Sequence, residues 1–161
     1  MDNPKGSKLN IETVYRAYAD MLYRVALSTL QSDMDAQDAV QDVFIKYLSS
    51  KPSFNDSEHE KAWFLRGTVN RCHDILRGRK VRLKFHADNA LEHDTPASMA
   101  EFELFEILSS IPEKYKSTVV LHCLEGLPLK ETADILGISL SAAKMRLSRA
   151  REFLREEEKD V

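Results

Sequence analysis

The segment from Leu129 to Glu157 constrains the fold most, because its helical spacing is interrupted once, at Gly137. Its second half spaces its apolar residues three and four positions apart, at Leu140, Ala143, Leu147, Ala150 and Leu154. Such spacing places the five side chains on one face of an α-helix. Gly137 can adopt the positive φ of a tight turn, and Ser139 can cap the following helix. The segment therefore predicts a short helix, a turn and a longer helix, which is the helix-turn-helix pattern.

The first half of the chain is also predicted to be helical. Only five Gly and five Pro occur among 161 residues, which is few for a fold rich in turns. Apolar periodicity predicts helices over about 10–30, from Ser32 or Asp33 to about Ser50, and over about 58–76. Ser57 is expected to cap the third of these, because Glu60 follows it at the capping-box spacing.

A break in the periodicity divides the chain. From Gly78 to Ala97 few apolar residues recur at helical spacing, and the segment is expected to be a linker. Beyond it, Pro112 is placed to begin a helix and Gly126 to end it. We therefore predict an all-α fold of two small helical domains, residues 1–79 and 98–161, joined by a linker over 80–97, with the C-terminal domain a helix-turn-helix.

Charge is unevenly distributed along the chain. The net charge is −3, so the total does not favour a nucleic-acid partner. From Lys61 to Lys84, however, eight basic residues stand against one acidic residue, and from Ser139 to Arg155 five stand against one. This segregation indicates two anion-facing surfaces on an otherwise acidic body. A solvated basic face is the simpler alternative for each segment.

The second helix of a helix-turn-helix unit enters the DNA major groove with its N-terminal residues near the base edges. Lys and Arg at such positions can reach guanine edges or phosphates. The candidates for this contact are Ser139, Ser141, Ala142, Lys144, Met145, Arg146 and Arg149. A helical hairpin with a glycine turn would show the same spacing, but it would not explain the clustered basic residues.

Other classes of function find little support in the sequence. Cys72 and Cys123 lie within apolar helical patterns and lack a CxxC spacing, so we expect two reduced, buried thiols in a cytoplasmic protein. A zinc site that combines them with His73 and His122 is a minor alternative. We expect no membrane insertion, because no apolar run is long enough to span a bilayer. We expect no metal or other cofactor, no small-molecule substrate and no catalytic residues, because nucleophile, metal and phosphate-loop motifs are all missing.

Three stretches of the chain form a further pattern: Asp35–Leu48, Ser53–Arg77 and Leu127–Glu156. In this order they resemble the extracytoplasmic-function group of sigma-70 RNA polymerase sigma factors, and the resemblance spans about Asn10 to Glu156. It implies a promoter-specificity subunit that binds core RNA polymerase, directs it to target promoters and aids initiation of transcription. It also implies an anti-sigma factor as a further partner, because the family is commonly controlled in that way.

The resemblance assigns roles to residues in the first domain. The residues implied to contact polymerase are Asp35, Asp38, Gln41, Asp42 and Phe44. Those implied to contact the downstream promoter element and the melted strand are Phe54, Asn55, Asp56, Trp63, Arg66, Asn70, Arg71 and Arg77. An aromatic ring can stack on an unpaired base and Arg can hold phosphates, although core packing is an equal alternative for Trp63.

Two alternatives to the sigma factor remain open from the sequence. One is a stand-alone helix-turn-helix transcription regulator that binds its operator without polymerase. The other is a sigma-like adaptor that binds polymerase but no longer binds DNA. The basic residues of the third helix, from Lys61 to Arg77, argue against both alternatives, because neither needs them.

Overall fold

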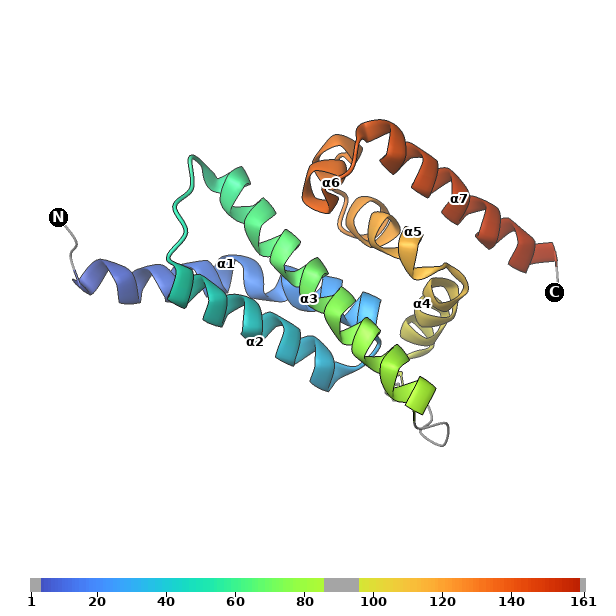
Figure 1. Cartoon of the computed structure of the whole chain (residues 1–161), viewed down its shortest axis with the longest axis horizontal. Helices are drawn as coiled ribbons and strands as arrows, with labels where there is room; N and C mark the ends of the chain where they lie inside the picture. Colours follow the sequence, from blue (N-terminus) through green and yellow to red (C-terminus); the bar gives the residue numbers. More distant parts are fainter. Residues whose placement is uncertain (1–3, 86–95, 160–161) are drawn as a thin grey trace.

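The computed structural model describes residues 4–85 and 96–159, and the side chains of 11–85 and 96–156. Seven α-helices and one π-helical segment make up this described part, which contains no strand (Figure 1). The prediction of an all-α fold is confirmed.

The first three helices form one bundle: α1 (Pro4–Leu30), α2 (Asp33–Ser50) and α3 (Ser57–Phe85). The turn between α1 and α2 is tight, with Gln31 at a φ of 55°. Ser32 caps α2 as predicted, because its Oγ accepts a hydrogen bond from the Asp35 amide at 3.3 Å. At the other end, Lys51 adopts the left-handed conformation and its amide donates to the Tyr47 carbonyl at 3.1 Å.

Both ends of α3 differ from the prediction. The residue that caps it is Asp56, whose Oδ1 accepts from the His59 amide at 2.8 Å, whereas Ser57 is the first helical residue. The helix also continues through Gly78 to Phe85 instead of ending near residue 76. The predicted linker is therefore helical over 80–85, and its part from 86 to 95 lies outside the described residues. Similarly, α1 begins at Pro4 and not near residue 10.

Aromatic rings fill the centre of this bundle. Phe64 of α3 is fully buried, and its ring centroid lies 5.1 Å from those of Tyr18 and Phe44 and 5.2 Å from that of Tyr47. These neighbours come from α1 and α2, so one side chain of α3 contacts both other helices. Tilted and stacked aromatic pairs at such separations stabilise a core beyond the area they bury.

The second unit contains α4 (Met99–Ser110), α5 (Glu113–Thr118), the π-helical segment Val119–Leu124, α6 (Leu129–Leu136) and α7 (Leu140–Lys159). Gly137 connects α6 to α7 at a φ of 67°, as the helix-turn-helix pattern predicts. Ser139 caps α7, with its Oγ accepting from the Ala142 amide at 3.1 Å. Ala143, Leu147 and Ala150 of the apolar face are buried, whereas Leu140 is 39% exposed.

The two units pack against each other. Helix α3 contacts α6, and α1 contacts both α4 and the π-helical segment. Figure 1 shows α1–α3 on one side of the molecule and α4–α7 on the other, with α3 next to the second unit. This arrangement brings the helix-turn-helix turn close to the basic helix of the first unit.

Substitutions at two glycines test whether the positive φ of Gly137 is needed for the turn between α6 and α7. Gly137→Ala is expected to destabilise the protein by about 1 kcal/mol, because a Cβ disfavours positive φ. Gly78→Ala is the matched control: Gly78 is helical and a Cβ there meets nothing within 4 Å, so the substitution should stabilise by about 0.5–1 kcal/mol. Urea unfolding of both variants measures the difference, and equal effects would contradict this account.

Candidate nucleic-acid interface

The first candidate surface lies along the N-terminal half of α7. Ser141, Lys144 and Met145 are exposed, and Met145 exposes 63% of its surface. Ser148 is exposed one turn further along, four residues after Lys144. The sequence analysis missed Ser148, although helical spacing from Ser141 and Lys144 would have found it. Together these residues form an exposed face near the turn, with two hydroxyls, one cation and one apolar side chain.

The remaining predicted residues of this helix have other surroundings. Ser139 is exposed but its hydroxyl caps the helix. Ala142 and Arg146 are half-buried, and an Arg146 Nη donates to the Lys114 carbonyl at 3.4 Å. Arg149 is exposed and pairs with Glu152 at 3.2 Å. The guanidinium of Arg146 is thus directed toward α5, while Arg149 remains accessible.

The second candidate surface is a pocket of about 240 Å³ between α2 and α3. Four residues predicted to contact the melted strand line it, namely Trp63, Arg66, Asn70 and Arg71. Their spacing of three, four and one residues places them on one face of α3. Lys46 of α2 adds a further cation to the lining. The carboxylates of Asp42 and Asp74 also line it, so three cations stand against two anions. An aromatic edge, an amide and an excess of cations around one pocket suit a nucleic-acid base and its phosphates.

Acceptors within the protein engage both arginines of this pocket. Arg71 Nε donates to Asp42 Oδ2 at 2.6 Å, across the α2–α3 contact. The Arg66 guanidinium donates to two carbonyls at the end of α6, at 3.0 Å to Asp134 and 3.3 Å to Ile135. Arg77 lies outside the pocket lining, is exposed, and pairs with Asp74 one turn before it.

The loop before α3 is held against the first turns of that helix. The Phe54 ring meets those of His59 and Trp63 edge-on, at centroid distances of 5.3 and 6.0 Å. The backbone N–H of Asn55 donates to His59 Nδ1 at 3.3 Å. Trp63 is half-buried and also contacts the rings of Tyr47 and Phe64. Core packing therefore accounts for much of Trp63, while part of the side chain lines the pocket.

Helix α2 presents only some of its predicted polymerase contacts to solvent. Asp38 and Gln41 are exposed, whereas Phe44 is 6% exposed and packs on Tyr15 and Phe64. The Asp42 carboxylate is paired with an arginine of α3. Phe44 is therefore mostly buried, although part of it lines the space between α1 and α2.

An apolar groove of about 730 Å³ lies between α1 and α2. Gln41 lines it, and so do Tyr15, Ile45 and Leu48. The side chains of these last three residues are each more than half exposed. Large apolar side chains that remain exposed side by side commonly mark a binding surface. The sequence analysis missed these three, because periodicity identifies apolar residues but does not tell which of them stay uncovered.

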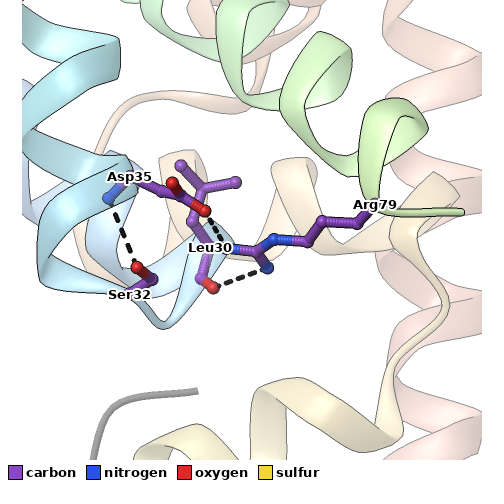
Figure 2. A network of polar contacts seen from close by, with 4 residues as sticks. All are labelled: Leu30, Ser32, Asp35 and Arg79. Carbon is purple, nitrogen blue, oxygen red and sulfur yellow. Dashed lines mark hydrogen bonds and ion pairs between the residues drawn. The ribbon is translucent and has the colours of Figure 1, made fainter. Parts of the chain in front are cut away.

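Asp35, another predicted polymerase contact, belongs to a buried network (Figure 2). Arg79, only 9% exposed, reaches from α3 to the α1–α2 turn. Its Nη1 donates to the Leu30 carbonyl at 2.9 Å and its Nη2 to Asp35 Oδ2 at 2.6 Å. A buried guanidinium is tolerated when it is both paired and hydrogen-bonded. The contact explains why α3 continues beyond residue 76.

Comparisons with known proteins match both units. The family model described as Sigma-70 region 2 matches residues 14–82, and the one described as Sigma-70, region 4 matches residues 101–154. RNA polymerase sigma factor SigV of Bacillus subtilis is 30% identical over 158 residues, covering 96% of this chain and 95% of its own. The chain belongs to the sigma-70 family of RNA polymerase sigma factors. This sigma factor is accordingly a promoter-specificity subunit of RNA polymerase, and sigma factors recognise promoters rather than act as catalysts.

Further relatives place it in the extracytoplasmic-function group. ECF RNA polymerase sigma factor SigW of Bacillus subtilis is 25% identical and covers 98% of this chain and 93% of its own. The sigma factor RpoE of Bartonella quintana, solved in complex with the anti-sigma factor NepR, has a TM-score of 0.73 at 25% identity and covers 96% of this chain and 98% of its own. CnrH, solved with the cytosolic domain of CnrY, shares the fold, with a TM-score of 0.74 at 22% identity, covering 97% of this chain and 92% of its own.

The two cysteines of this sigma factor differ in their surroundings. Both thiols are free, but only Cys72 is buried, and burial raises its pKa to about 12. The prediction that Cys123 is buried is wrong: it lies in the π-helical segment, where the wider i→i+5 turn shifts the predicted register. The alternative zinc site is not supported, because these two cysteines, His73 and His122 do not form a cluster among the described residues that could hold a metal ion.

The described residues contain neither a metal-binding cluster nor a membrane-spanning helix. Residues 4–85 and 96–159 hold no cluster of three or more His, Cys, Asp and Glu side chains arranged for a metal ion. Within the same residues, no helix combines the length and hydropathy that crossing a bilayer requires.

The Arg79 network should contribute measurably to stability. Arg79→Met leaves the Asp35 carboxylate unpaired and the Leu30 carbonyl without this donor, at an expected cost of about 2–4 kcal/mol. Arg77→Met is the matched control, because the exposed pair of Arg77 with Asp74 is worth less than about 1 kcal/mol. Urea unfolding compares the two variants, and similar losses would show that burial of Arg79 is unimportant.

Histidine 73 should make stability depend on pH. It is half-buried between the units, with Nε2 2.9 Å from Ser117 Oγ, and burial lowers its pKa. Asp74 and Glu113 oppose this shift, whereas Arg77 and Arg146 reinforce it.

Because the folded protein disfavours protonated His73, the unfolded chain binds more protons as pH falls through the unfolded value of about 6.5. The free energy of unfolding is therefore expected to fall from pH 7.5 to pH 5.5. The fall should be smaller in His73→Gln, which keeps a hydrogen-bonding group but does not titrate. Urea unfolding across this range measures both proteins, and identical pH profiles would contradict the role of His73.

Proposed function

We propose that this sigma factor divides promoter recognition between its two units. The first unit would bind the downstream element and the melted strand through Trp63, Arg66, Asn70 and Arg71 at the pocket between α2 and α3. The helix-turn-helix would bind the upstream element through the exposed face of α7. The observation that carries this proposal is the gathering of these four α3 residues around one pocket. We propose the same division for the domains, 1–79 and 98–161, although helix α3 continues past the first boundary to Phe85.

We further propose that core polymerase docks on the groove between α1 and α2. The exposed apolar side chains of Tyr15, Ile45 and Leu48 would supply buried area, and Asp38 and Gln41 on α2 would supply polar contacts to a basic partner helix. Asp35, Asp42 and Phe44 would act by holding α2 in place, because each contacts α3.

We also propose an anti-sigma factor as a partner, no catalytic activity and a cytoplasmic location. An anti-sigma factor is expected to bind this chain, because RpoE and CnrH were both solved in complex with such partners or their domains. The protein would have no catalytic activity of its own. It would act in the cytoplasm, where its polymerase partner works.

Run-off transcription on a genomic promoter library with purified core polymerase tests the proposal. Discrete transcripts that require this protein are expected. Binding to core polymerase without new transcripts would favour the polymerase-binding adaptor. Operator binding together with failure to bind polymerase would favour the stand-alone regulator, and either result would contradict the proposal.

The groove can be tested by one substitution. Ile45→Glu places a charge among the apolar side chains of the groove, and we expect polymerase affinity to fall about tenfold or more, because the charge must be desolvated on docking. Ile107→Glu on α4 is the matched control, since Ile107 is 45% exposed but lies outside the groove. Pull-down titration on core polymerase measures both, and equal affinities would exclude the groove as the docking site.

A further inference from the structure

We propose that Met145 contacts the 5-methyl group of a thymine in the upstream promoter element and so helps to select its sequence. The contact rests on the role proposed above for the exposed face of α7, because that face must enter the major groove. It makes one apolar side chain a determinant of sequence, whereas cations that hold phosphates position the helix without reading bases.

Met145 points almost directly away from the core of the second unit. Ala143, Leu147 and Ala150 are buried and define the inner face of α7. A helix turns by about 100° per residue, so Met145 lies on the side opposite to these three. It exposes 63% of its surface, against 39% for Leu140 at the start of the helix. A helix that meets DNA with its outer face would therefore bring Met145 close to the floor of the groove.

Met145 also lies in the part of α7 where a helix-turn-helix reads bases. The helix begins at Leu140, and the Ser139 hydroxyl caps it by accepting from the Ala142 amide at 3.1 Å. Met145 thus belongs to the second turn of the helix. In proteins of this motif the N-terminal residues of the second helix contact base edges. The position of Met145 is therefore one at which a side chain can discriminate between base sequences.

The neighbours of Met145 leave it room to project from the outer face. At helical spacing it is surrounded by exposed residues with short hydroxyls or with cations, namely Ser141, Ser148, Lys144 and Arg149. Arg149 pairs with Glu152 at 3.2 Å, so the acid further along this face is directed to a cation. Cations at the edges of the face suit the phosphates along the walls of a groove. The short serines leave the centre of the groove to the longer side chain of Met145.

The chemistry of Met145 fits one feature of the major groove. The base edges there carry hydrogen-bond donors and acceptors, and their apolar group is the 5-methyl of thymine. A thioether has no donor and is only a weak acceptor, so it is a poor reader of the other groups. It is also flexible and polarizable, which lets it adjust to a methyl group that it covers. Burial of both apolar groups favours thymine over cytosine, which lacks the methyl.

Binding of DNA by the holoenzyme tests the contact. Holoenzyme made from core polymerase and the full chain first selects its upstream element from duplexes with random bases at that site. Each thymine of the selected element is then replaced in turn by deoxyuridine, which pairs in the same way but lacks the 5-methyl group. At one thymine the replacement is expected to weaken binding about threefold to tenfold. Met145→Gln, which keeps the length of the side chain but not its apolar character, should remove this difference.

Three further variants separate the contact from general effects. Met99→Gln is the matched control, because Met99 is 72% exposed but lies on α4, and it should leave the ratio of affinities for thymine and deoxyuridine unchanged. Met145→Leu keeps an apolar side chain and should keep the preference for thymine. Lys144→Ala should weaken binding to both duplexes by the same factor, because a phosphate contact carries no information on the base.

The outcomes distinguish this contact from the role of α7 as a whole. If the holoenzyme selects an upstream element but deoxyuridine is tolerated at every thymine, the contact is overturned and the role of α7 stands. A preference for thymine that persists in Met145→Gln would overturn it in the same way. Selection of no upstream sequence would contradict the proposed role of the helix-turn-helix, and the contact of Met145 with it.

Discussion

Helix α3 packs against α1 and α2 and also against α6, and the rest of the structure depends on these contacts. Phe64 and Arg79 connect it to α1 and α2, through aromatic contacts at one point and a buried guanidinium at another. Arg66 on a different face connects it to α6. The same helix carries the basic residues expected to meet the promoter strand, so its accessible face is decided by the position of the second unit.

The electrostatics of the chain follow from this arrangement. A chain with a net charge of −3 is expected to bind free DNA weakly, because affinity that is independent of sequence comes mainly from neutralised phosphates. Here the arginines of the pocket are also bonded to acceptors of the protein itself, Arg71 to Asp42 and Arg66 to α6. DNA binding would then become strong only when polymerase presents both surfaces together. Such conditional binding suits a subunit that should select promoters only within the holoenzyme.

Local chemistry made part of the structure predictable. Ser32 and Ser139 cap their helices and Gly137 forms its turn because the deciding interactions span three or four residues. The end of α3 was not predictable in this way, since Arg79 bonds to a carbonyl 49 residues earlier. The family resemblance indicated the four residues of the pocket. It did not indicate the exposed groove on α1 and α2 or the contacts of Arg24 with Glu125 and of Arg66 with α6, because those depend on packing between distant segments.

The central claim is that core polymerase docks on the groove between α1 and α2, where Tyr15, Ile45 and Leu48 are exposed. Amide hydrogen exchange of the whole sigma factor, alone and bound to core polymerase, tests it directly. Slower exchange over α1 and α2 in the complex is the predicted result, because docking would cover both helices. Unchanged exchange along the groove would contradict the claim.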